Sequence, residues 1–344
     1  MHREIEIEEA LDLSNPCFVD VRSPQEYELD TIPGAVNVPL LDNEERHRVG
    51  LVYAEKGPAE ARKLGLSLVA PKLPILLEQL EDAKGEQLVL FCWRGGDRSK
   101  AVASILDIMH IPCFRLKGGY KAYRQYINKM LHQSELPQQF VVLYGLTGTG
   151  KTEIIRELGQ RGYPILDLEA LAQHRGSVFG AVGLPQQPSQ KKFESLIWSR
   201  IKHCKNSRLL IVEGESKKIG KLYLPDSLYN GMQAGFKILV TDSISQRVRR
   251  LIKDYVDSGE TNLSQVKTSL DYLTRRLGKQ KVDYLQHLLS VKDLEQFTAI
   301  LLEDYYDVLY GKSIEGPGQY DLIVDAGNFQ SAVEKIEEFI QHLI

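Results

Sequence analysis

The chain has 344 residues, a net charge of −3 and 43% hydrophobic residues, which together predict a globular protein with room for two domains. No apolar stretch is long enough to cross a membrane, and the acidic start of the chain lacks the apolar segment of a secretory signal. The four cysteines (Cys17, Cys92, Cys113 and Cys204) form no CxxC pair, which argues against a disulfide framework and a zinc site. These features favour a reducing, cytoplasmic location and no membrane partner.

Charge is distributed unevenly along the chain. Residues 1–60 hold 14 acidic and 5 basic side chains, whereas residues 191–221 hold 9 Lys or Arg and 3 Glu. A second basic cluster lies within residues 267–281. Such segments are compatible with a polyanionic partner, but on charge alone a solvated helix face is the simpler interpretation.

The first third of the chain alternates short apolar runs with helical patterns. Strands are predicted at residues 18–21, 35–38, 89–91 and 114–116, and helices at 24–29 and 99–109. This alternation is typical of an α/β domain with a largely parallel sheet. The polar, proline-containing segment 133–139 is predicted to be a linker, so the first domain is expected over residues 1–132.

A second α/β domain is expected over residues 140–344. It opens with an apolar strand at residues 140–144. Further strands are predicted at 165–166, 209–212, 237–240 and 321–324, with helices between them. The chain is therefore predicted to contain two doubly wound domains.

A cysteine follows the strand at 89–91, within the segment Cys92-Trp93-Arg94-Gly95-Gly96-Asp97-Arg98-Ser99. The N-terminus of the next helix, together with Arg94 and Arg98, would favour a thiolate over a thiol. The two glycines let backbone amides curl around an anion. We therefore predict that Cys92 is a nucleophile toward sulfur, selenium or phosphate-type oxyanions, with Arg94 and Arg98 as catalytic partners; the alternative is a buried structural cysteine.

A phosphate-binding loop is predicted directly after the strand at 140–144. Residues 145–152 match G-x-x-x-x-G-K-[ST] between a predicted strand and a predicted helix, which is the context this motif requires. Lys151 supplies a positive charge, and the hydroxyl of Thr152 is placed to bind Mg²⁺. The motif recognises a chain of phosphates rather than ATP in particular. The predicted phosphate- or diphosphate-binding residues are Gly145, Gly148, Thr149, Gly150, Lys151 and Thr152.

Several charged residues are candidates for substrate or metal contacts. The strand at 209–212 ends in Glu213, where P-loop enzymes usually carry Asp, and this departure argues against efficient ATP hydrolysis. Asp167 and Glu169 follow the second strand, where they either face a substrate or cap a helix. The remaining candidates for contacts to a transferring group or to tRNA phosphates, with surface charge as the alternative, are Arg175, Arg247, Arg249 and Arg250.

Three segments of the first domain resemble rhodanese domains. Residues 19–27 and 32–39 are similar to the segments that open such domains, and the Gly-Gly pair within 116–120 is similar to the one that closes them. In common rhodanese sulfurtransferases four residues separate the Cys from the Arg, whereas five separate Cys92 from Arg98, which is closer to rhodanese-like phosphatases. Those phosphatases usually have His before the cysteine, where this chain has Phe91. Asp30-Thr31 replaces the usual Gly-His in a turn.

A rhodanese domain joined to a P-loop domain resembles the tRNA 2-selenouridine synthase family, and residues 166–169 and 174–177 are similar to that family's second domain. The resemblance implies replacement of sulfur by selenium in wobble 2-thiouridine of the tRNAs for Lys, Glu and Gln. In that family the sulfur is first alkylated by geranyl diphosphate, and the geranylthio group is then displaced with selenophosphate. No tightly bound cofactor is expected apart from Mg²⁺, and an enzyme that supplies selenophosphate is an expected partner.

Two other interpretations remain open. One is a rhodanese-type sulfurtransferase coupled to an ATP-dependent kinase or adenylating domain. The other is a nucleotide-gated binding protein whose rhodanese domain is inert, against which the intact Cys92 argues. The sequence also leaves open whether Cys92 carries selenium covalently or only assists the displacement.

Overall fold

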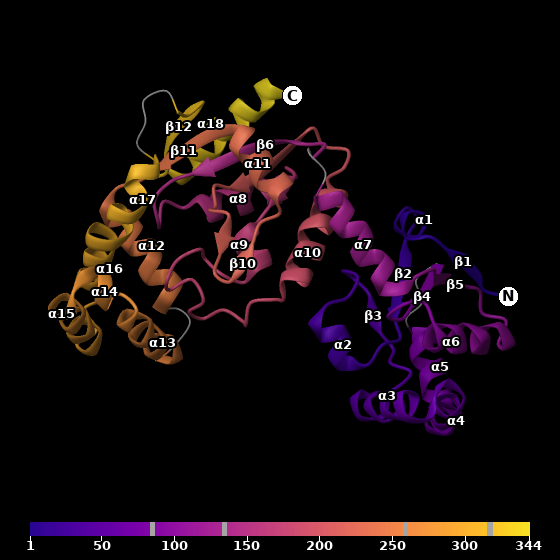
Figure 1. Cartoon of the computed structure of the whole chain (residues 1–344). Coiled ribbons are helices and arrows are strands. Elements are labelled where there is room, and N and C mark those ends of the chain that lie inside the picture. Colours follow the sequence, from indigo (N-terminus) through magenta and orange to yellow (C-terminus); the bar gives the residue numbers. More distant parts are fainter. Residues whose placement is uncertain (83–86, 133–135, 257–259, 315–318) are drawn as a thin grey trace. The chain divides into compact units, whose positions relative to one another are not determined.

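The computed structural model describes residues 1–82, 87–132, 136–256, 260–314 and 319–344 (Figure 1). It divides into two compact units, residues 1–130 with 189–198 and residues 131–188 with 199–344. Residues 189–198 thus belong to the first unit but fall within the range predicted for the second domain. Residues 133–135 of the predicted linker lie outside the described residues.

The first unit is built on a parallel sheet of five strands in the order β1-β5-β4-β2-β3. Its strands are β1 (Arg3–Ile5), β2 (Pro16–Asp20), β3 (Val36–Asn37), β4 (Gln87–Phe91) and β5 (Cys113–Leu116). The helices in this part of the chain are α1 (Ile7–Leu11), α2 (Pro24–Leu29), α3 (Asn43–Lys56), α4 (Pro58–Val69), η1 (Ala70–Lys72), α5 (Leu73–Asp82), α6 (Asp97–Ile108) and α7 (Gly119–Leu131).

Strand β4 is buried on both faces, which explains its continuous apolar run. Leu88 and Leu90 belong to a core that includes Leu76 of α5 and Leu106 of α6. Val89 is completely buried as well, and alternation along a strand directs it to the opposite face of the sheet. The next residue after β4 is Cys92, so the cysteine lies at the carboxyl edge of the sheet.

Residues 189–198 pack against α7. The Arg124 guanidinium donates to Ser195 Oγ at 2.9 Å and forms an ion pair with Glu194. The rings of Tyr126 and Trp198 meet edge to face, with centroids 6.0 Å apart. These contacts attach the segment to the first unit.

The second unit contains a parallel sheet of five strands in the order β12-β11-β6-β8-β7 and a separate antiparallel pair, β10-β9. The strands are β6 (Gln139–Tyr144), β7 (Ile165–Leu166), β8 (Leu209–Glu213), β9 (Lys218–Ile219), β10 (Leu222–Tyr223), β11 (Phe236–Thr241) and β12 (Leu322–Asp325). The helices from α8 onward are α8 (Lys151–Gln160), α9 (Leu168–Ala172), α10 (Gln190–His203), α11 (Asp226–Ala234), α12 (Ile244–Val256), α13 (Glu260–Asp271), α14 (Thr274–Leu277), α15 (Lys279–Ser290), α16 (Leu294–Leu301), η2 (Leu302–Tyr306), α17 (Asp307–Ile314) and α18 (Phe329–Leu343).

The central strand of this sheet, β6, positions the predicted phosphate loop. Ile154 and Leu158 of α8 and Ile336 of α18 form a core with the sheet. Because β6 lies between β8 and β11, the loop that follows it emerges in the middle of the carboxyl edge, where α/β sheets bind ligands. The predicted fold class, two α/β domains with parallel sheets, is confirmed.

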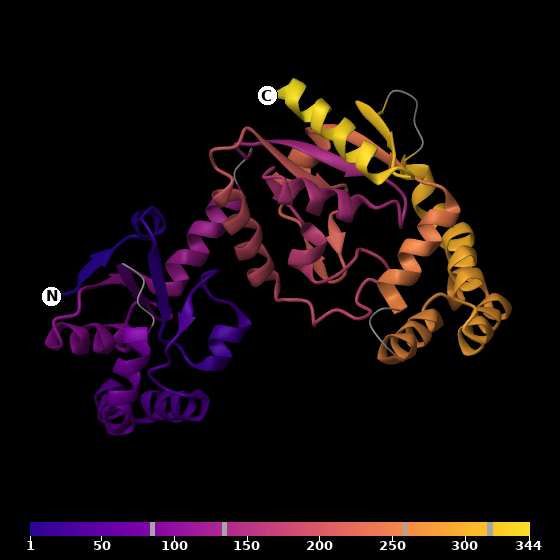
Figure 2. The same cartoon turned by 180° about the vertical axis from the view of Figure 1, so that it is seen from behind.

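Helices α12 to α17 form a group with its own apolar core, which includes Leu270, Leu285 and Leu302 (Figure 2). This group was not predicted in detail from the sequence, and neither were strand β1 and the β9-β10 pair. Among the described residues, none of the helices is both long and apolar enough to span a membrane.

Candidate active sites

The thiol of Cys92 is held inside its loop by two polar groups. Its side chain is only 3% exposed. Sγ accepts the backbone N–H of Gly96 at 3.2 Å and lies 3.3 Å from Ser99 Oγ. Because Gly96 is the N-cap of α6, the sulfur faces the first turn of that helix, as the sequence predicts. This arrangement suits a group that carries negative charge.

The two arginines of the loop differ in their surroundings. Arg98 makes two hydrogen bonds to the Glu26 carboxylate, at 2.5 and 3.2 Å. Burial acts to lower the pKa of Arg98, but the hydrogen bonds and charge of Glu26 outweigh it and raise the pKa. Charge from Arg98 helps to lower the pKa of Glu26 although burial opposes the shift. Arg94 is exposed. Arg94 is therefore the more available of the two for an incoming anion.

The Gly118-Gly119 pair closes over the cysteine loop. Gly119 has a φ of +56°, and a Cβ there would collide with the carbonyl oxygen of Cys92. That same carbonyl accepts the Tyr120 N–H at 2.8 Å, and the Trp93 carbonyl accepts the Lys121 N–H at 2.9 Å. Glycine is required here because the start of α7 supports the loop by direct backbone contact.

A buried ion pair lies beside the loop. Asp20 and Arg22 are 0% and 1% exposed, and Arg22 Nη2 is 2.7 Å from Asp20 Oδ2. The Arg22 guanidinium also lies 4.1 Å from the centroid of the Tyr120 ring and 5.9 Å from that of Trp93. The charge of Arg22 is thus committed to the structure around the loop.

The phosphate loop has the backbone its motif predicts. Gly148 and Gly150 have φ values of +81° and +87°, and Gly150 is the N-cap of α8. The Lys151 ammonium folds back over the loop and donates to the carbonyls of Gly145 at 2.8 Å and Leu146 at 3.1 Å. Thr149 Oγ1 donates to the Leu146 carbonyl at 2.9 Å. Burial lowers the pKa of Lys151, while Glu169 and Glu215 act in the opposite direction.

Two arginines of α12 hold the outer side of this loop. Arg247 donates to the Thr147 carbonyl at 2.8 Å and forms a double hydrogen bond with Asp307 at 2.8 and 2.6 Å. Arg250 donates to the Gly148 carbonyl at 3.1 Å and pairs with Asp242. Both have structural partners, whereas Arg249 is exposed.

Carboxylates surround the other side of the loop. Thr152 Oγ1 donates to Glu169 Oε2 at 3.0 Å. Glu213 is fully buried and accepts the Leu168 N–H at 2.9 Å, so it supports the chain after β7. Burial raises the pKa of Glu213 well above its usual value, and the charges of Asp167 and Glu169 add to the effect.

Glu215 lies two residues after Glu213, just beyond the end of β8, and its charge acts on Lys151. Its carboxylate lies so close to Gly176 that a Cβ there would be 2.7 Å from Oε2. Burial raises the pKa of Glu215 to about 7, Glu169 adds to the shift, and Lys151 opposes it. Glu215 was not predicted as a site residue, although its position just after a sheet strand was a usable signal.

A cavity of about 410 Å³ lies beside the loop, and Glu213, a predicted contact residue, is not in its wall. Most of the predicted loop residues lie in its wall, as do Arg175, Glu169 and Glu215. Asp167 does not: it caps α9 by accepting the Ala170 N–H and pairs with Arg156. Arg175 donates to the Val182 carbonyl at 2.9 Å. The cavity combines a cationic loop with nearby carboxylates, as a site for a metal-bound phosphate ester does.

Fold and sites together define a class: proteins that join a rhodanese-like domain with a cysteine loop to a P-loop domain. Residues 5–126 match the family described as rhodanese-like domain. Residues 138–342 match the family described as tRNA 2-selenouridine synthase AAA domain.

Whole-chain comparisons agree with these two matches. A tRNA 2-selenouridine synthase from Cupriavidus pinatubonensis is 37% identical over 87% of this chain and 88% of its own length. Proteins of the same name from Bordetella bronchiseptica and Bordetella petrii are 36% and 34% identical, over 88% and 93% of this chain and 89% and 92% of their own lengths. The chain belongs to the tRNA 2-selenouridine synthase family.

Proposed function

We propose that this chain is a transferase that converts 2-thiouridine in tRNA into 2-selenouridine, with one step at each loop. The observation that supports the proposal is that one chain of this family joins a rhodanese-like domain with a cysteine loop to a P-loop domain. A thiocarbonyl sulfur is a poor leaving group, so its replacement requires prior activation. Two sites for two different anions suit a reaction that activates the sulfur first and displaces it second.

In the proposed first step the P-loop holds geranyl diphosphate. The sulfur of 2-thiouridine attacks the allylic carbon, the carbon–oxygen bond breaks, diphosphate leaves, and the N3 proton of the base is released. Lys151 and the loop amides stabilise the charge that develops on the diphosphate. Lys151 already lies over the loop carbonyls, within reach of a group bound there.

The residues near Thr152 fit Mg²⁺. A hydroxyl and a carboxylate are hard oxygen ligands, and Thr152 Oγ1 and Glu169 Oε2 are 3.0 Å apart. In the described part of the chain no three His, Cys, Asp or Glu side chains are grouped to hold a metal by themselves. Thr152 and Glu169 would therefore share the ion with the diphosphate and water, and the ion would supply charge neutralisation to the leaving group.

In the proposed second step the Cys92 loop receives selenophosphate. Selenium bonds to C2 of the base, the C2–sulfur bond breaks, geranylthiol leaves, and the phosphoryl group passes to water. The N–H of Gly96 donates to Sγ itself, and the exposed guanidinium of Arg94 in the same loop is available to an oxyanion. The contacts of Sγ with the Gly96 N–H and the Ser99 hydroxyl support participation of Cys92 in this step over a purely structural role.

The proposed tRNA substrate is that of the family, with wobble 2-thiouridine in the tRNAs for Lys, Glu and Gln. The predicted basic cluster at 267–281 supports a polyanion, because its Arg275, Arg276 and Lys279 are exposed on α14 and α15. The selenium donor requires an enzyme that makes selenophosphate, and the cytoplasm is the proposed location.

The test is product analysis with an anticodon stem-loop that contains 2-thiouridine, geranyl diphosphate, selenophosphate and Mg²⁺. We expect Lys151→Ala to abolish geranylation, and Cys92→Ala to accumulate the geranylated nucleoside without 2-selenouridine. Matched controls are Lys221→Ala, an exposed lysine of the second unit, and Cys113→Ala, a cysteine whose burial raises its pKa to about 11. An unchanged geranylation rate in Lys151→Ala, or turnover of ATP in place of geranyl diphosphate, would overturn the proposal.

A further inference from the structure

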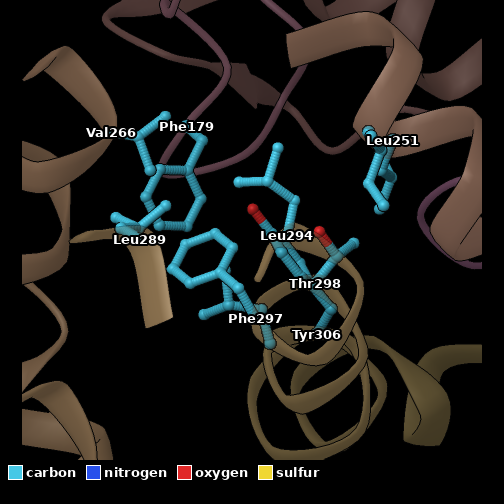
Figure 3. Close-up of a pocket in the computed structure, with 10 residues that line it drawn as sticks. Phe179, Leu251, Val266, Leu289, Leu294, Phe297, Thr298 and Tyr306 are labelled. Carbon is cyan, nitrogen blue, oxygen red and sulfur yellow. The ribbon is translucent and has the colours of Figure 1, made fainter. Parts of the chain in front are cut away.

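A second, apolar cavity lies among the helices that follow the sheet strand β11. It has a volume of about 30 Å³ and is lined by side chains of α12, α13, α15 and α16 and by Phe179. Figure 3 shows Phe179, Val266, Leu289 and Phe297 gathered on one side and Leu251 on the other. Thr298 and Tyr306 contribute hydroxyl groups, and the remaining lining side chains are hydrocarbon or aromatic.

This cavity adjoins the phosphate loop through one side chain. Leu251 lines both the apolar cavity and the larger cavity that contains Lys151. On the loop side, a Cβ added to Gly148 would lie 3.2 Å from Leu251 Cγ. The same helix, α12, donates hydrogen bonds from Arg247 and Arg250 to loop carbonyls. Leu251 therefore borders the apolar cavity and also lies next to the phosphate loop.

The two adjacent cavities suit a molecule with a charged head and a hydrocarbon tail. The loop offers amides and an ammonium to a diphosphate. The neighbouring cavity offers apolar surface, which contributes roughly fourfold in affinity for each CH₂ group removed from water. A nucleoside diphosphate has no group of this kind, because its base and ribose carry several hydrogen-bonding atoms.

We infer that the apolar cavity between α12, α13, α15 and α16 binds the isoprenoid chain of an allylic diphosphate whose head lies on the phosphate loop. This inference rests on the proposed function. A cavity of about 30 Å³ accommodates about two water molecules. A ten-carbon chain is several times larger than this space, so its entry requires Leu251, which lines both cavities, and other lining side chains to move apart.

The inference makes chain length the determinant of specificity. Substitution of Val266, which is 4% exposed and lines the cavity, by Phe fills the space without touching the loop. Val291→Phe is the matched control, since Val291 is 57% exposed at the end of α15. The substrates are dimethylallyl diphosphate with five carbons and geranyl diphosphate with ten, and inorganic diphosphate is the competitor that reports on the head site alone.

The test compares kcat/KM for the two prenyl substrates and the inhibition constant of inorganic diphosphate. For the unsubstituted protein we expect a preference for geranyl over dimethylallyl diphosphate of about 100-fold or more, below the roughly 1000-fold bound set by five buried carbons. Val266→Phe should reduce this preference at least tenfold, with dimethylallyl transfer and diphosphate inhibition within twofold of the unsubstituted protein. Val291→Phe should change none of the three values.

If folded Val266→Phe keeps the preference for geranyl over dimethylallyl diphosphate, the inference is overturned. Geranyl transfer by the unsubstituted protein would still support the proposed function. If no prenyl group is transferred, equilibrium competition separates the two claims. The tail site alone is upheld if geranyl diphosphate binds more tightly than inorganic diphosphate and Val266→Phe loses this difference. Leu251→Ala provides a second variant should Val266→Phe not fold. It opens the wall, and a shift of at least tenfold toward the fifteen-carbon farnesyl diphosphate is expected; no shift would overturn the inference.

Discussion

At the scale of single residues, the ion pair between Asp20 and Arg22 illustrates how burial changes the importance of a contact. Both side chains are almost completely withdrawn from water, and the carboxylate receives three hydrogen bonds from Arg22 side-chain atoms at 2.7 to 3.0 Å. Removal of one partner leaves the other charged and unpaired in the protein interior.

We expect Arg22→Ala to lower the free energy of unfolding of the first unit by about 3–5 kcal/mol. The control is Arg62→Ala, because the Arg62–Asp97 pair is 65% and 64% exposed and should contribute about 0–1 kcal/mol. Urea denaturation followed by circular dichroism measures both. A decrease of less than about 1 kcal/mol in the free energy of unfolding of Arg22→Ala would contradict this prediction and would show that water stabilises the Asp20 carboxylate in place of Arg22.

The carboxyl of Glu215 predicts a dependence of stability on pH. Its pKa is raised to about 7 in the folded chain, whereas an unfolded glutamate ionises near its ordinary value. Below about pH 4.5 the group is protonated in both states. As pH rises from there to about 7, the unfolded chain releases its proton first, so ionisation of Glu215 progressively favours unfolding.

Glu215→Gln should therefore be more stable than the unsubstituted protein at pH 8, by about 1–3 kcal/mol, and equally stable at pH 4.5. The amide keeps the shape of the neutral acid and does not ionise. Thermal melts in EDTA at both pH values provide the measurement, with Glu153→Gln as an exposed control near the same loop. Equal stabilisation at both pH values would contradict the prediction.

The sequence predicted Cys92, Arg94, Arg98 and the phosphate loop because each belongs to a continuous motif. Ser99 belongs to the same segment, but its contact with Sγ was not predicted. Glu26, 72 residues before Arg98, carries no motif that names its partner. Pairings of this kind depend on distances between segments that only the folded chain brings together.

At the scale of elements, the junction between the cysteine loop and α7 depends on glycine. Gly119→Ala places a methyl group against the Cys92 carbonyl at a positive φ. We expect this variant to displace the loop, destabilise the first unit by about 1–3 kcal/mol and abolish selenation while geranylation persists. Stem-loop product analysis and thermal melts test both effects.

Gly96→Ala is the control for that variant. Gly96 lies in the same loop, has a negative φ, and has no atom within 4 Å of the position of an added Cβ. The backbone N–H that contacts Cys92 remains. Both variants with the same loss of selenation would contradict the explanation by steric contact.

Apart from the edge strand β1, which was not predicted, the strands of both sheets were predictable from the sequence. Parallel strands buried on two faces appear as continuous apolar runs, as in β4, β6 and β8. The helices α13 to α17 were not predicted in detail. They share a core to which several helices each contribute a few apolar residues, and no single helix shows from its own sequence how the group assembles.

At the scale of the whole molecule, the two loops lie on different units of the chain: Cys92 in the first and Lys151 in the second. If the proposed steps are separate reactions, a protein that has lost one site retains the other. The geranylated RNA is then an intermediate that one molecule can release and another can bind.

We expect a mixture of Cys92→Ala and Lys151→Ala proteins to form 2-selenouridine from the 2-thiouridine stem-loop, although neither protein does so alone. The rate should increase with protein concentration, because the intermediate passes through solution. Nucleoside mass spectrometry detects the product. A mixture that stops at the geranylated nucleoside, with both proteins folded, would show that the intermediate is not exchanged.

The sequence by itself determined the fold class, the order of the two domain types and the positions of the cysteine loop and the P-loop motif, since local patterns of apolar residues and glycines specify these. Only the tertiary structure decided which residues surround each loop: Glu26 beside Arg98, Glu169 and Glu215 beside Lys151, and Arg247 and Arg250 around the loop's outer side. The apolar cavity that Leu251 lines was likewise decided only by the tertiary structure. The physical reason is that these arrangements arise from packing between segments far apart in the chain, which no local pattern records.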